Sequence, residues 1–268
     1  MYRYLLISLL CAGAYLPVQA QGKLLSDKAL KKTKVFRSLE EALKTPDEVY
    51  RLKLGNKKLT AIPAKVFQLK NLQHLSLSLN KIRRIPPQIM LLPNLQELIL
   101  SGNQLSTLPQ ALAQLKNLRK LTLSKNKFVN VPAVVSQIPT LKEVFFDHNQ
   151  IKAIPDKFWD LPLLFQASFA NNRLTQLGAA IKKAQNMELL YIPHNQLKAF
   201  PTEMGELKKL KTIYAHNNRL STLPKSFEKL KNLVLLSIYK NDSKLLENRL
   251  YISSMLPYAR IEYIKGIF

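Results

Sequence analysis

The chain has 268 residues, of which 47% are hydrophobic, and its formal net charge at pH 7 is +24. A chain of this length can bury a real hydrophobic core in one or two domains. Its 7 glycines against 15 prolines, without any low-complexity tract, argue against a protein built from flexible linkers.

The first twenty residues have the layout of an export signal. Arg3 precedes an apolar run from Leu5 to Tyr15, and small residues lead up to Ala20. We therefore predict a cleavable signal peptide over residues 1–20 and export to the periplasm, the cell surface or the medium. The alternative is an uncleaved membrane anchor, for which the run is short. Cleavage would remove Cys11, the single cysteine, and so exclude disulfides, zinc–thiolate sites and a cysteine nucleophile from the mature protein.

Residues 21–48 form a predicted N-terminal segment that contains one short capping helix. In the stretch SLEEAL, Ser38 stands three residues before Glu41, which is the spacing of a capping box. Thr45 and Pro46 end that helix, because the residue before a proline avoids helical backbone angles.

A repeat with a period of 23 residues occupies residues 49–242. An apolar residue opens each of its nine units: Val49, Leu72, Leu95, Leu118, Leu141, Leu164, Met187, Leu210 and Leu233. Eight residues later an asparagine recurs in every unit after the first, which has Lys57 there: Asn80, Asn103, Asn126, Asn149, Asn172, Asn195, Asn218 and Asn241. A proline closes the pattern, with Gly178 as the exception: Pro63, Pro86, Pro109, Pro132, Pro155, Pro201 and Pro224.

This pattern, L-x-x-L-x-L-x-x-N-x-L-x-x-L-P, resembles the leucine-rich repeat family. The 23-residue unit is similar to the Ras-associated repeat class, and an exported chain without cysteines resembles a bacterial member. The resemblance implies an α/β solenoid, a horseshoe with a parallel β-sheet on its concave face and short helical or 3-10 turns on its convex face. It also implies a non-enzymatic recognition module without a cofactor, which binds a protein partner through the concave face.

Elementary physical chemistry gives the repeated residues structural roles. The leucines of one short strand can be buried only against the neighbouring coils. The asparagine is expected to lie inward, where its amide pairs with backbone groups of the turns. The proline has no N–H and suits the irregular convex side.

Residues 243–268 form a predicted C-terminal cap. An amphipathic pattern favours a helix from about Lys244 to Met255, which must end before Pro257. A last strand is expected near Arg260 to Ile264.

The side chains between the leucines of each strand are predicted to point to the concave face. Aromatic, histidine and acidic side chains gather in its second half: Phe145, Asp147, His148, Tyr191, His194, Tyr214, His216 and Tyr239. Because adjacent strands lie about 4.8 Å apart, we predict one contiguous patch that binds a protein partner. His74 is expected on the same face, within a first half of small polar and basic residues.

Two other interpretations of these positions stay open. The first is that the core does not constrain them, so that they hold almost any residue. The second is a metal site of His148, His194 and His216, which come from different coils without a local ligand spacing.

The positive charge suggests a second function class. Most of the excess falls on the convex side and the turns, where lysines could bind an anionic glycan, lipopolysaccharide or a membrane surface in a salt-sensitive way. An envelope structural protein is a third possibility. Export makes nucleic acid an unexpected partner, and we expect a monomer.

Catalytic motifs are missing from the sequence. It has no phosphate-binding glycine-rich loop, no G-x-S-x-G turn and no H-E-x-x-H helix. Glu97 and Glu143 share a concave column about 10 Å apart, but no sugar cleft accompanies them. We therefore predict no enzymatic activity and no catalytic residue.

Overall fold

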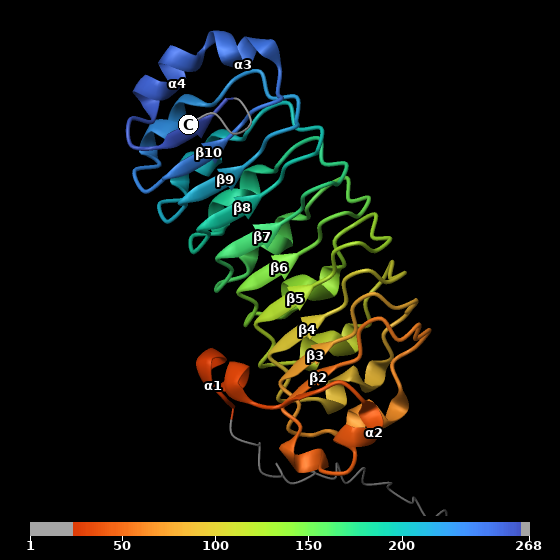
Figure 1. Ribbon diagram of the computed structural model, residues 1–268. Coiled ribbons are helices and arrows are strands. Elements are labelled where there is room, and N and C mark those ends of the chain that lie inside the picture. Colours follow the sequence, from red (N-terminus) through yellow and green to blue (C-terminus); the bar gives the residue numbers. More distant parts are fainter. Residues whose placement is uncertain (1–23, 264–268) are drawn as a thin grey trace, which may run out of the picture.

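The computed structural model describes residues 24–263, so the predicted signal peptide lies outside the described residues. Within this range the strands form one parallel sheet in which every strand pairs with its neighbours in chain order. They stack along the length of the molecule (Figure 1). Their bounds are β1 Val35–Phe36, β2 Arg51–Lys53, β3 His74–Ser76, β4 Glu97–Ile99, β5 Lys120–Thr122, β6 Glu143–Phe145, β7 Gln166–Ser168, β8 Leu189–Tyr191, β9 Thr212–Tyr214, β10 Leu235–Ser237 and β11 Arg260–Glu262.

The register of this sheet follows the sequence period. Leu52, Leu75 and Leu98 are aligned across β2, β3 and β4, and the same step of 23 residues continues to β10. One period is therefore one complete coil, and each leucine lies over the equivalent leucine of the next coil. The predicted solenoid with its parallel concave sheet is confirmed, and the sheet is open at both ends of the described range.

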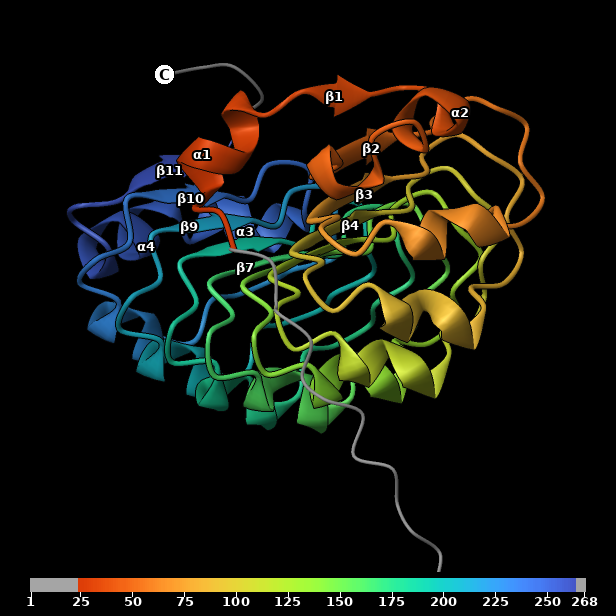
Figure 2. The same cartoon turned by 90° about the horizontal axis from the view of Figure 1, so that it is seen from below.

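Short 3-10 helices form the opposite, convex side (Figure 2). Each 3-10 helix after the first begins at the residue that follows the end of the repeat pattern, which is usually the proline. The proline has an extended backbone and no N–H, so it leaves no backbone donor without a partner at this position. Their bounds are η1 Pro46–Glu48, η2 Ala64–Gln68, η3 Pro87–Leu91, η4 Gln110–Gln114, η5 Ala133–Gln137, η6 Asp156–Asp160, η7 Ala179–Lys183, η8 Thr202–Glu206 and η9 Lys225–Lys229. At Gly178 the backbone has the same extended geometry without the proline.

The space between strands and 3-10 helices is filled by the repeated apolar residues, most of which are fully buried. In the middle of the array large rings take over this role. Phe146 stacks on Phe169 with ring centroids 5.7 Å apart, and Phe128, Phe158 and Trp159 contact this pair edge to face or one another. We call these five side chains the aromatic belt.

The repeated asparagines form an internal ladder. Asn172 accepts from the N–H of Ile151 at 2.9 Å and donates to the carbonyls of Phe146 and Phe169 at 2.9 and 3.0 Å. Most equivalents repeat these contacts, so this side chain joins its own coil to the preceding one, as predicted.

A second ladder runs along the edge where the strands begin. Here each asparagine donates to a backbone carbonyl 24 residues earlier: Asn71, Asn94, Asn117, Asn186 and Asn232. Thr140, Leu163 and Lys209 stand at the equivalent positions of the three other coils in this range. This ladder was not predicted from the sequence, although the dipeptide Asn-Leu before several strands shows the same period.

Three helical caps and two outer strands close the array. Helix α2, Leu39–Ala42, starts where predicted, and the Ser38 hydroxyl accepts from the Glu41 N–H. The Glu41 carboxylate pairs instead with Lys34, so the capping box is half formed. The predicted single helix after Lys244 is wrong: α3, Ser243–Glu247, and α4, Arg249–Met255, are separate, with Asn248 between them.

The N-terminal segment contains two elements that the sequence analysis did not predict. Strand β1 extends the sheet beside β2, and helix α1, Asp27–Lys32, lies on the concave side, opposite the 3-10 helices (Figure 2). No helix among residues 24–263 combines the length and apolarity that crossing a bilayer requires.

Candidate functional site

The concave face is built from the strand residues that alternate with the buried leucines and from the turn directly after each strand. At that turn the backbone adopts a left-handed conformation, with a φ of 53° at His148 and 55° at His194. Asn171 and Asn217 hold the equivalent positions in neighbouring coils. Left-handed backbone suits glycine and asparagine best, but Leu79, Lys125 and Lys240 adopt it at equivalent positions, so the turn alone does not select histidine.

Five side chains of the predicted patch form one cluster of stacked and edge-on rings. Tyr191 stacks on Tyr214 with centroids 4.9 Å apart, and His216 stacks on Tyr239 at 4.2 Å. His216 joins the two pairs through an edge contact with Tyr214 and meets His194 at 5.6 Å. We call Tyr191, His194, Tyr214, His216 and Tyr239 the tyrosine–histidine cluster.

The cluster offers both apolar ring surface and hydrogen-bonding groups. Burial, reinforced by the neighbouring Tyr214, raises the pKa of the Tyr191 hydroxyl above its ordinary value, so this group stays protonated and can donate at neutral pH. His216 Nδ1 lies 3.1 Å from the Ser237 hydroxyl, which restrains that ring. Pre-ordered aromatic side chains lose little entropy when a partner covers them, which favours binding.

The other three predicted residues lie apart from the cluster, on the far side of the small side chains of β7. Lys120 sits over the Phe145 ring, 5.1 Å from its centroid. Asp147 accepts from the Ser124 hydroxyl at 3.1 Å and from the Ala170 N–H at 2.9 Å, and it also bonds the Ser168 hydroxyl. The structure therefore gives Asp147 a role in joining coils.

His148 is exposed and has only a long contact, 3.4 Å, between its Nε2 and the side-chain nitrogen of Asn171. Among the described residues there is no group of three or more histidine, cysteine, aspartate or glutamate side chains placed to hold a metal ion.

The first half of the concave face differs from the prediction. His74 is only 6% exposed, and its Nδ1 donates to Glu97 at 2.6 Å. Within the described residues its other ring nitrogen, Nε2, is buried without a hydrogen-bond partner. The expectation that His74 projects into an open concave surface is wrong, because the N-terminal segment covers it.

Polar contacts hold this segment in place. The Leu25 N–H donates to Gln73, Gln96 donates to the Leu25 carbonyl, and Asp27 pairs with Arg119 at 2.7 Å. Arg51 donates to the carbonyls of Lys31 and Thr33, and Leu30 is buried although it is not part of the core between strands and 3-10 helices. Sequence reasoning missed this cover because none of these contacts has a local pattern.

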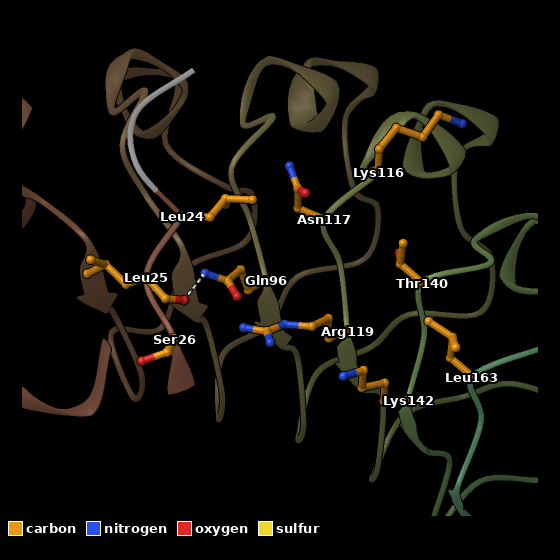
Figure 3. Close-up of a pocket in the computed structure, with 10 residues that line it drawn as sticks. All are labelled: Leu24, Leu25, Ser26, Gln96, Lys116, Asn117, Arg119, Thr140, Lys142 and Leu163. Atoms are coloured by element: carbon orange, nitrogen blue, oxygen red, sulfur yellow. Dashed lines mark hydrogen bonds between the residues drawn. The ribbon is translucent and has the colours of Figure 1, made fainter. Parts of the chain in front are cut away.

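A pocket of about 430 Å³ opens where the segment crosses the edge of the sheet (Figure 3). It lies beside the two coils in which Thr140 and Leu163 replace the asparagines of the second ladder. Its lining residues are Leu24, Leu25, Ser26, Gln96, Lys116, Asn117, Arg119, Thr140, Lys142 and Leu163.

Comparison with family models agrees with the architecture. A leucine-rich repeat model matches residues 47–105 and 89–128, and a second leucine-rich repeat model matches residues 209–230. These matches support the leucine-rich repeat family. No curated protein matches this leucine-rich repeat chain at a significant level.

Solved structures share the leucine-rich repeat fold. A leucine-rich repeat protein of Leptospira interrogans is 22% identical, with a TM-score of 0.53 over 86% of this chain and 100% of that one. An internalin of Listeria monocytogenes is 20% identical, with a TM-score of 0.68 over 82% of this chain and 62% of that one. The plant peptide hormone receptor RGFR1, solved in complex with RGF2, is 25% identical, with a TM-score of 0.65 over 78% of this chain and 35% of that one. This chain thus spans less than two thirds of the internalin and of the receptor.

Proposed function

We propose that the protein is an exported, non-enzymatic recognition module that binds a protein partner through the second half of its concave face. The observation that carries this proposal is the tyrosine–histidine cluster, five rings linked by pairwise contacts on β8, β9 and the turns that follow β8, β9 and β10. Tyrosine-rich, pre-ordered surfaces carry much of the binding energy at protein interfaces. Because the N-terminal segment lies against part of the first half, the proposed contact surface consists of β8, β9, β10 and the turns that follow them.

The structural relatives support this assignment at the level of the fold. The plant receptor carries the same solenoid and was solved with RGF2 bound. A parallel sheet with an open concave face gives a partner a rigid, curved surface, because the buried leucines and asparagines hold each strand in place.

A triple variant tests the proposal. Tyr191→Ser, Tyr214→Ser and His194→Asn introduce the residues that other coils carry at the same positions, Ser168, Ser237 and Asn171, so the fold is expected to persist. With the partner isolated by cross-linking on the native surface, we expect the triple variant to bind it about 100-fold more weakly in calorimetry.

The matched control removes two exposed tyrosines from the C-terminal cap, Tyr251→Ser and Tyr258→Ser, which are 51% and 81% exposed. It should bind like the wild type. Equal affinity of the triple variant and the control would show that the concave cluster is not the binding surface.

A second candidate function is electrostatic attachment to an anionic surface. The observation in its favour is the net charge of +24, with exposed lysines on and beside the last 3-10 helices at Lys182, Lys208, Lys225, Lys229 and Lys231. Titration with vesicles containing anionic lipid should then show binding at low salt that is lost at high salt, because exposed charges are screened. Absent or salt-independent binding would reject this function.

A further inference from the structure

We propose that the pocket between the N-terminal segment and the strand-start edge of β4–β6 binds a small amphiphilic anion, a carboxylate or phosphate joined to an apolar group. The proposal is independent of the concave cluster, which lies over β8–β10. The volume of the pocket, about 430 Å³, is in the range of small-molecule sites.

The lining is positively charged. Lys116, Arg119 and Lys142 contribute three cations, and no aspartate or glutamate is among the lining residues. Arg119 pairs with Asp27 through one nitrogen, Nη2, and Lys116 donates to the Ala113 carbonyl. Across the described residues, no hydrogen bond or ion pair involves the Lys142 ammonium group. The pocket therefore contains an unpartnered cation beside a guanidinium, an arrangement that suits an anionic group.

Three of the four neutral polar side chains of the lining already donate to backbone carbonyls, and the fourth, Ser26, accepts from the Ala29 N–H. Gln96 donates to the Leu25 carbonyl, Asn117 donates to the Pro93 carbonyl and the Thr140 hydroxyl donates to the Leu118 carbonyl. The three donors hold the coils and the segment together, which leaves the cations and the Ser26 hydroxyl as donors for a ligand.

Apolar walls stand on both sides of these cations. Leu24 and Leu163 are 43% and 45% exposed and come from opposite sides of the pocket, while Arg119 and Lys142 extend toward the N-terminal segment (Figure 3). Leu163 stands where Asn117 and Asn186 stand in other coils, so a polar position of the second ladder has become an apolar wall. Exposed leucines gain free energy when an apolar group covers them.

The arrangement selects the ligand class. A purely inorganic anion would leave both leucines in water, and a neutral hydrocarbon would leave the Lys142 ammonium unpaired. A molecule with one anionic end and one apolar end satisfies both.

Calorimetric titration with decanoate and with decyl phosphate, below their micelle concentrations, tests the proposal and distinguishes a carboxylate from a phosphate ligand. Decanol and decyltrimethylammonium have the same tail without the negative charge. We expect saturable binding of at least one anion at one site per chain, and no comparable binding of the neutral or cationic analogue.

Two substitutions probe the two ends of the ligand. Lys142→Gln introduces the residue that stands at the equivalent position two and three coils earlier, Gln96 and Gln73, and we expect about fivefold weaker binding. Leu163→Asn restores the residue of the second ladder, and we expect about tenfold weaker binding. Both residues occur naturally in this scaffold, so both variants are expected to fold, which circular dichroism checks.

Lys182→Gln on η7 is the matched control, because it removes the same charge on the convex side. It should leave anion binding unchanged. The proposal is overturned if neither anion binds saturably, if decyltrimethylammonium binds as well as the anions, or if Lys142→Gln and Leu163→Asn bind like the control.

Discussion

The asparagine ladder shows how much one buried side chain does in this protein. Asn172 is 8% exposed and serves backbone groups of two coils, with one N–H and several carbonyls bonded to its amide. Removing the amide leaves these buried groups unpaired, which costs more than the loss of the hydrogen bonds themselves.

We predict that Asn172→Ala lowers the free energy of unfolding by about 3 kcal/mol, because several buried backbone groups lose their partner at once. Urea denaturation followed by circular dichroism measures the change. Asn130→Ala, at an exposed position outside the ladder, should change the free energy of unfolding by less than about 0.5 kcal/mol. A similar loss in both variants would contradict the ladder's role.

Glu97 links stability to pH. The hydrogen bond from His74, assisted by the charges of His74, Lys120 and Lys31, lowers the pKa of the Glu97 carboxyl below its ordinary 4.5 in spite of its partial burial. A carboxyl with a lowered pKa stabilises the folded state above its unfolded pKa, and this contribution is lost as the pH falls through the folded pKa.

Glu97→Gln is therefore expected to lower the free energy of unfolding by about 1 kcal/mol at neutral pH. The difference from the wild type should shrink as the pH falls below about 4.5. Thermal unfolding over a pH series measures both. A difference that stays constant down to pH 3 would show that Glu97 acts through packing and not through its charge.

At the scale of elements, the strands and 3-10 helices follow from the repeat, whereas the N-terminal segment does not. Short 3-10 helices and three-residue strands have little stability alone, and they persist because each coil is packed between two others. Helix α1 packs on one side only, mainly through polar contacts and Leu30.

We predict that Leu30→Ser releases the segment without unfolding the coils, since a large buried contact is lost where little else holds α1. Hydrogen exchange should show lost protection at the Leu25 and Thr33 amides, whose partners are Gln73 and the Leu30 carbonyl. Amides between coils, such as Leu77, should keep theirs. The control is Lys28→Ser, at an exposed position of the same helix. If Leu30→Ser removed protection equally from the coils and from the segment, the two would unfold as one unit.

At the scale of the whole molecule, the solenoid is an array in which every coil contacts its neighbours only. Stability is then approximately a sum of contributions from coils and from the interfaces between them. The aromatic belt lies near the middle of this array, where Phe169 contacts both Phe146 and Phe158.

Phe169→Ala is expected to cost about 3–5 kcal/mol and to uncouple the two halves of the array, so that denaturant unfolding shows two transitions. The intrinsic fluorescence of Trp159, which contacts Phe158, should report the unfolding of the aromatic belt. Circular dichroism should report the unfolding of the whole chain. The control is Phe36→Ala, which removes a buried ring from the terminal strand β1. Because the rest of the array stays continuous, this variant should unfold in a single transition. A single transition in the Phe169 variant would show that coupling does not depend on the belt.

Sequence alone determined the period, the strand positions, the inward asparagines and the alternation that sends Tyr191 and Tyr214 to the concave face. These features are local and repeat every 23 residues, so one coil predicts the next. The asparagine before several strands also repeats with this period, but the second ladder was not predicted, because the carbonyls that it bonds lie in the preceding coil.

Tertiary structure alone decided the rest: the split of the predicted patch into the tyrosine–histidine cluster and the separate Phe145, Asp147 and His148, the covering of His74, and the pocket beside Lys142. Each depends on contacts between residues far apart in the chain, such as Leu25 with Gln96 and Asp27 with Arg119. The N-terminal segment is outside the period, so no pattern in the repeat specifies where it lies. Its position follows from the free energy of burying Leu30 and pairing its polar groups on one particular part of the folded surface.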